Sequence, residues 1–161
     1  MKILTTTTAF LVASAFAAQA GGGGSYDSSG VATGMTKNVV KMASEGHVVM
    51  QTMGIYETMT TDDPDNPMNG LSGECFGALE IIGTAATGGG LCVFSGDGED
   101  AISVRWTADG MTAQGALVGQ WSATGGTGAL AGATGGGSFQ SLTNMETGTF
   151  ENRLTGALTV P

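Results

Sequence analysis

The sequence predicts an all-β fold, a small antiparallel barrel of eight strands, with a two-sheet β-sandwich as the runner-up. From Asn38 onward apolar and polar residues alternate with a period of two between turn residues. No stretch has helical periodicity for more than one or two turns. The 29 glycines have no three-residue period, which excludes collagen and suits a strongly coiled sheet. Eight antiparallel strands can close without leaving a free edge, which favours the barrel.

Residues 1–20 have the three zones of a secretory signal. Lys2 supplies the positive charge, an apolar stretch follows, and small residues precede a cleavage site near Ala20. The apolar stretch is shorter than the roughly 20 residues that span a bilayer, and no second hydrophobic segment follows. We therefore expect a secreted or periplasmic protein without membrane insertion.

The mature chain is expected to begin with a flexible glycine- and serine-rich lead-in over residues 21–36, which has little to bury. A single barrel domain follows over residues 37–161. A strong hairpin turn lies at residues 95–100, whereas residues 61–73 form a long acidic loop with prolines. The eight strands are expected at 38–43, 46–60, 74–82, 90–95, 101–107, 113–122, 136–143 and 147–160.

The mature chain is strongly acidic. Without Lys2, four basic residues remain against 14 acidic ones, a formal charge of −10. Nucleic acids and anionic membrane surfaces are therefore poor partners. A solvated surface that keeps an exported protein soluble explains this acidity better than an acidic docking patch.

Cys75 and Cys92 are predicted to form a disulfide, because exported proteins fold in oxidising compartments. Suppose that the two cysteines pair directly across neighbouring strands and that the following turn places Phe94 opposite Ile102. These two pairs then determine which side chains lie on each face of the central sheet. Its apolar face then carries the disulfide, Leu79, Ile81, Val104 and Trp106. The other face is mixed and open to coverage by another subunit; it carries Phe76, Glu80, Val93, Ser103 and Arg105.

The segment WSATGGTGALAGATGGGSF, residues 121–139, resembles the signature of the allene oxide cyclase barrel-like and dirigent-like proteins. In that family a strand ends, Gly-Gly-Thr-Gly forms a tight connection with a short helical turn, and the next strand begins near Gly-x-Gly. The strands around Cys92 and Trp106 also look like those of bacterial relatives without an assigned role. The resemblance implies a calycin-like eight-stranded barrel and a homo-oligomer, a trimer in plant members. None of the family's catalytic residues maps onto this chain, and Ala129-Leu130 replace a common basic and aromatic pair.

Two strands supply the candidate site. One face of the strand at 46–60 carries an apolar row, in which Gln51 and Glu57 would be polar groups inside an apolar cavity. Removal from water would suit Glu57 to transferring a proton, which makes it the candidate catalytic residue; alternatively, Glu57 is solvated near the strand end. The predicted ligand-binding residues are Gln51 and Met53 of this row, Asn152 of the last strand, and Trp106 and Trp121 as stacking aromatics.

No metal or cofactor is predicted. Met42, Met50, Met53 and Met59, with His47 nearby, offer soft ligands for copper, but Met50 and Met53 fall on opposite strand faces, so methionine as core filler is the better interpretation. One histidine and no Gly-x-Ser-x-Gly motif argue against a hydrolase triad.

Three functions remain open at the level of sequence. The first is an exported barrel that binds a small hydrophobic molecule or another macromolecule. The second is a cyclase or isomerase that folds a hydrophobic substrate inside the barrel, with Glu57 transferring the proton. The third is a structural secreted module. The sequence does not decide whether the protein is an enzyme.

Overall fold

The computed structural model describes residues 23–161, which contain ten β-strands and one short 3-10 helix joined by turns and loops. The predicted signal sequence and its cleavage site near Ala20 lie outside these residues. Within them, no helix is long and apolar enough to cross a membrane. The elements are β1 Gly24–Asp27, β2 Gly30–Thr36, β3 Val39–Ser44, β4 His47–Thr61, β5 Ser72–Ile82, β6 Ala85–Ser95, β7 Ala101–Met111, β8 Leu117–Thr127, η1 Gly128–Leu130, β9 Thr134–Thr143 and β10 Thr149–Val160.

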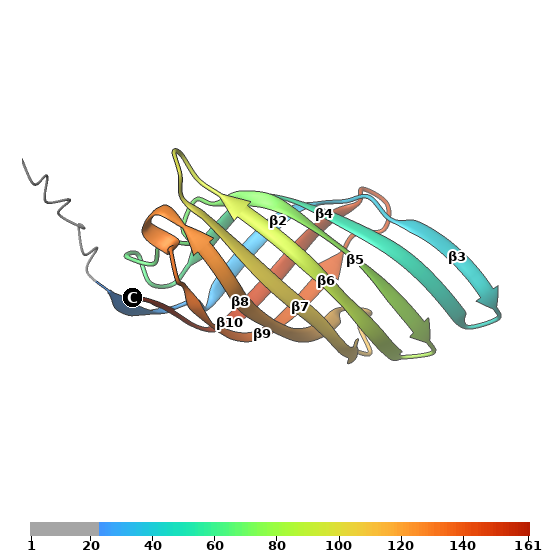
Figure 1. Cartoon of the computed structure of the whole chain (residues 1–161). Coiled ribbons are helices and arrows are strands. Elements are labelled where there is room, and N and C mark those ends of the chain that lie inside the picture. The colour runs from blue at the N-terminus through green and yellow to red at the C-terminus, as the bar shows by residue number, and fades with distance from the viewer. Residues whose placement is uncertain (1–22) are drawn as a thin grey trace, which may run out of the picture.

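Eight of these strands close into an antiparallel barrel (Figure 1). The order around the barrel is β2-β4-β5-β6-β7-β8-β9-β10, and β10 pairs with both β9 and β2. Two further strands lie outside the ring: β1 pairs with β10, and β3 pairs with β4 in a hairpin that extends past the barrel rim (Figure 1). The predicted fold class, an eight-stranded antiparallel barrel, is confirmed.

The strand that closes the barrel is one that the sequence did not predict. Residues 24–36 were expected within a flexible lead-in, but they form β1 and β2, and β2 pairs with β4 and β10. The inward residues of β2 are small: Ala32 is fully buried, and a Cβ atom at Gly34 would collide with the carbonyl oxygen of Ile55. A strand with such residues shows no hydrophobic alternation. The segment predicted as the first barrel strand is instead the edge strand β3, whose six residues are all exposed.

The disulfide and the facing of the central sheet are as predicted. Cys75 of β5 lies directly opposite Cys92 of β6, and the two are bonded. Phe94 lies opposite Ile102 on β7, and both side chains are buried. On the outer face, Phe76 is 52% exposed. Correct pairing across the two hairpins therefore places the apolar face of β5, β6 and β7 in the core.

Loops close one end of the barrel. In the loop between β4 and β5, Met68 is only 2% exposed and packs into the core. The buried side chain of Asn66 holds this loop against the end of β1: its Nδ2 donates to the carbonyl of Asp27 at 2.8 Å, and its Oδ1 accepts from the Met68 amide at 2.8 Å. Leu130 of η1 is fully buried at the same end. The short helical turn expected in the glycine-rich segment is present as η1.

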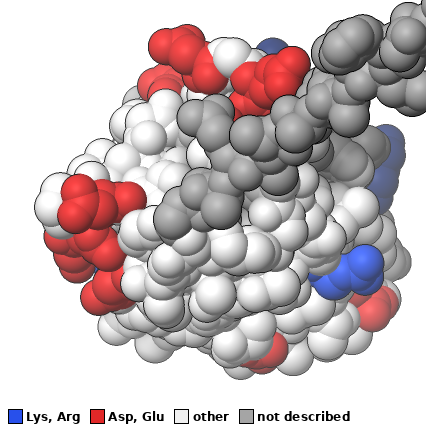
Figure 2. Space-filling view, turned by 60° about the vertical axis from the view of Figure 1, so that its left-hand side comes forward, with Lys and Arg blue, Asp and Glu red and all other residues white. Residues whose placement is uncertain are grey.

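Acidic residues concentrate on the turns of this closed end. The β4–β5 loop carries three aspartates and the β6–β7 turn carries three more acidic residues. The face in Figure 2 has acidic groups near its margins and a broad uncharged surface between them. The charge of the protein thus lies on its exterior, away from the core.

Candidate functional site

The barrel encloses a cavity of about 610 Å³. Its lining consists mainly of aliphatic, aromatic and methionine side chains, contributed by all eight barrel strands. Among the described residues that line it there is no aspartate, glutamate, histidine, lysine or arginine. Small-molecule sites in proteins are commonly cavities of roughly 300–1,000 Å³ with an apolar lining and a few polar groups. Volume and lining both agree with such a site.

The cavity opens at the end of the barrel opposite the closing loops. At its inner end lie Met59 and Met68, both buried. Toward the other end the lining residues become exposed, Val40 of β3 to 50% and Met145 of the β9–β10 loop to 84%. The apolar lining therefore continues to a lip around the mouth, where a molecule can enter without crossing a charged ring.

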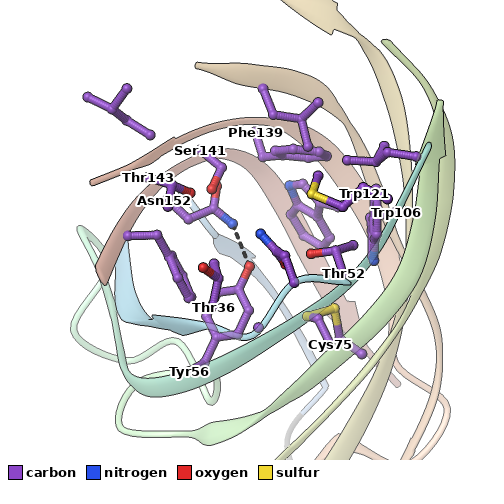
Figure 3. A pocket seen from close by; sticks show the side chains of 18 of the residues that line it. Thr36, Thr52, Tyr56, Cys75, Trp106, Trp121, Phe139, Ser141, Thr143 and Asn152 are labelled. Atoms are coloured by element: carbon purple, nitrogen blue, oxygen red, sulfur yellow. Dashed lines mark hydrogen bonds between the residues drawn. A yellow bond between two sulfur atoms is a disulfide. The ribbon is translucent and has the colours of Figure 1, made fainter. Parts of the chain in front are cut away.

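A pair of polar side chains, Tyr56 of β4 and Asn152 of β10, lies on one wall of the cavity (Figure 3). The Asn152 Nδ2 donates to the Tyr56 Oη at 2.9 Å. The two residues reach each other across β2, where Gly34 is paired with Tyr56 and Ala32 with Asn152. Ala32 and Gly34 are small, so no β2 side chain separates Tyr56 from Asn152 on the inner face of the barrel.

Aromatic rings fix the position of Tyr56. Its ring packs edge-on against Phe150 at 4.7 Å and against Phe94 at 5.2 Å between centroids. Burial raises the pKa of Tyr56 to about 12, and the hydrogen bond from Asn152 acts in the opposite direction. The phenol is therefore neutral at physiological pH and available as a hydrogen-bond donor.

Two polar atoms in the wall have no partner among the described residues: the Oδ1 of Asn152 and the Nε1 of Trp106. Asn152 is only 6% exposed and lines the cavity, and its Oδ1 is itself buried. By contrast, the Nε1 of Trp121 donates to the carbonyl of Thr155 at 3.0 Å. Figure 3 shows Trp106 and Trp121 on the side of the cavity away from Tyr56 and Asn152. Unpartnered buried polar atoms are uncommon in folded proteins and call for an explanation.

The structure brings together half of the predicted site residues. Asn152, Trp106 and Trp121 line the cavity, and their role in ligand binding stays a prediction. Gln51, Met53 and Glu57 lie on the outer face of β4 and are exposed, so their predicted interior position is wrong, and the reason for a catalytic Glu57 is lost with it. The inward side chains of β4 are those of the other row, Val48, Met50, Thr52 and Tyr56.

A β-bulge explains part of this error. Thr33 of β2 is paired with Thr58, whereas the next residue, Gly34, is paired with Tyr56, so Glu57 is the extra residue on β4. Alternation changes phase at the bulge, and the inward positions are even-numbered before Glu57 and odd-numbered from Met59 onward. The prediction chose the more apolar row and gave the whole strand one phase, but that row points inward only beyond the bulge, at Met59.

The methionines of the copper hypothesis do not converge. Met50 and Met59 line the cavity, but Met42 is 72% exposed and Met53 lies on the outer face. Residues 23–161 also contain no group of three histidine, cysteine, aspartate or glutamate side chains that could hold a metal ion. The inward methionines fill irregular space in an apolar wall, as this residue commonly does.

The fold and the cavity define a small closed β-barrel with an internal, uncharged cavity. No protein-family model matches the chain, and neither a curated protein nor a solved structure is significantly similar to it. Membership of the allene oxide cyclase barrel-like family and the trimer that it implies therefore stay predictions.

Proposed function

We propose that this protein binds a small, largely apolar molecule inside the barrel. The observation that carries the proposal is the cavity of about 610 Å³, sealed by Met68 and its loop at one end and open at an apolar lip at the other. Burial of apolar ligand surface supplies the driving force, at roughly 25 cal/mol per Å². A purely structural module would gain stability by filling this space with side chains, since empty core volume is destabilising.

Binding is better supported than a cyclase or isomerase activity. General acid–base catalysis works best with a group whose pKa lies near the working pH. Tyr56, the one titratable side chain among the described lining residues, has its pKa raised to about 12 by burial. The remaining polar lining consists of amides, hydroxyls and indoles, which suit hydrogen bonding and not proton abstraction.

A fluorescent probe tests the proposal. The uncharged dye N-phenyl-1-naphthylamine should bind the mature, disulfide-bonded protein with an increase in its emission. Thr52→Phe, which fills the cavity from β4, should weaken binding about tenfold or more, whereas Gln51→Phe on the outer face of the same strand should leave it unchanged. Thermal unfolding of both variants checks that they fold. Equal binding by the two variants, or no binding by the wild type, would refute a site inside the barrel.

A further inference from the structure

The unpartnered amide of Asn152 bears on the chemistry of the ligand. Tyr56 Oη accepts the hydrogen bond from Asn152 Nδ2, so its own O–H remains available to donate. Asn152 Oδ1 has no partner among residues 23–161, so its lone pairs remain available to accept. Both residues line the cavity, and the pair therefore leaves one donor and one acceptor that no described residue uses. Turning the amide over exchanges the two roles and leaves the same combination.

Resting on the proposed function, we infer that the ligand is an uncharged alcohol with a hydrocarbon body, whose hydroxyl lies at the Tyr56–Asn152 pair. A hydroxyl donates one hydrogen bond and accepts another, which satisfies both sides of the pair with a single group. The aliphatic and aromatic lining of the rest of the cavity receives the hydrocarbon. The buried Nε1 of Trp106, on another wall, is a further donor without a partner among residues 23–161.

Charged and purely apolar ligands fit this wall less well. A carboxylate can only accept, so it leaves Asn152 Oδ1 unpaired, and no cationic side chain among the described lining residues compensates its charge. A bare hydrocarbon leaves both sides of the pair without a partner. An ether accepts from Tyr56 but has no proton for Asn152. The alcohol is thus distinguished from each of these by the donor that it brings to Asn152.

Three ligands of equal chain length separate these alternatives: 1-decanol, decyl methyl ether and decanoate, each used to displace N-phenyl-1-naphthylamine from the mature protein at neutral pH. We expect 1-decanol to bind at least about tenfold more tightly than either of the others. Asn152→Leu should abolish the preference for alcohol over ether, whereas Gln51→Leu on the outer face should preserve it. Tyr56→Phe, which keeps the ring packing, is a second variant that should weaken the binding of alcohol and ether alike, in case Asn152→Leu does not fold.

The outcomes distinguish the inference from the proposed function. Suppose that the dye binds but that 1-decanol, the ether and decanoate displace it equally, or that decanoate displaces it best. In either case the inference of an alcohol ligand is wrong and the proposed binding function stands. If none of the three ligands displaces a bound dye, the inference that the ligand is an alcohol is also wrong. If the dye itself does not bind, both proposals fall.

Discussion

Tyr56 should make the protein less stable at alkaline pH. Burial raises its pKa from the ordinary value of 10.0 to about 12. Between these two pH values the phenol is ionised in the unfolded chain but still protonated in the barrel, so the folded state binds more protons. The stability that Tyr56 contributes is therefore fully present below pH 10 and is lost as the pH rises through the folded pKa.

The size of this effect follows from the shift. One pKa unit corresponds to about 1.36 kcal/mol, so a rise of about two units predicts a loss of about 2.7 kcal/mol between pH 10 and pH 12. Urea unfolding followed by tryptophan fluorescence at several pH values in this window measures the loss. The ultraviolet absorbance of tyrosinate reports the titration itself.

Tyr56→Phe is the matched control, since it removes the titrating group and keeps the ring between Phe94 and Phe150. At neutral pH it should cost roughly 1–3 kcal/mol, because Asn152 Nδ2 loses its acceptor in a buried site. Above pH 10 its free energy of unfolding should fall less steeply than that of the wild type. If both proteins lose stability with the same slope, the phenol is not held neutral by the barrel and the reasoning fails.

Three further predictions concern the barrel itself. Replacing Cys75 and Cys92 by serine should lower the free energy of unfolding by about 3 kcal/mol in urea, because the bond closes a loop across a sequence separation of 17; unchanged stability would contradict this. Leu130→Ala at the closed end should cost about 2–5 kcal/mol, against at most about 0.5 kcal/mol for the exposed Leu91→Ala; equal losses would argue against a packed end. Gly137→Ala should cost about 1–3 kcal/mol, since its Cβ would collide with a carbonyl of β10; a wild-type melting temperature would refute that contact.

The central sheet could be predicted because one covalent constraint and one local constraint determine its register. The disulfide placed Cys75 opposite Cys92, and the tight turn after β6 placed Phe94 opposite Ile102. Once these pairs are set, period-two alternation assigns every side chain of β5, β6 and β7 to a face. Trp106 was correctly placed in the cavity for this reason.

β4 lacked such a constraint. Both of its faces carry apolar residues, since Val49 and Met53 lie outside and Met50 inside, so composition alone does not reveal the inner row. The bulge at Glu57 then breaks the single phase that an alternation argument assumes. Tyr56 was missed because it belongs to the less apolar of the two rows, which the prediction therefore placed on the exterior.

Composition alone could not show one structural role of the glycines: several of them leave space for the tryptophan rings in the barrel wall. Trp106 is paired with Gly90, which is itself paired with Gly77, and a Cβ atom at Gly77 would lie 2.5 Å from the Trp106 ring. Trp121 is likewise paired with Gly137, and its indole reaches across to a carbonyl of β10. Each indole thus extends over glycines of the adjacent strands and not across the barrel. Larger side chains at these glycines would push the rings inward, so the same glycines that permit tight coiling also keep the cavity open.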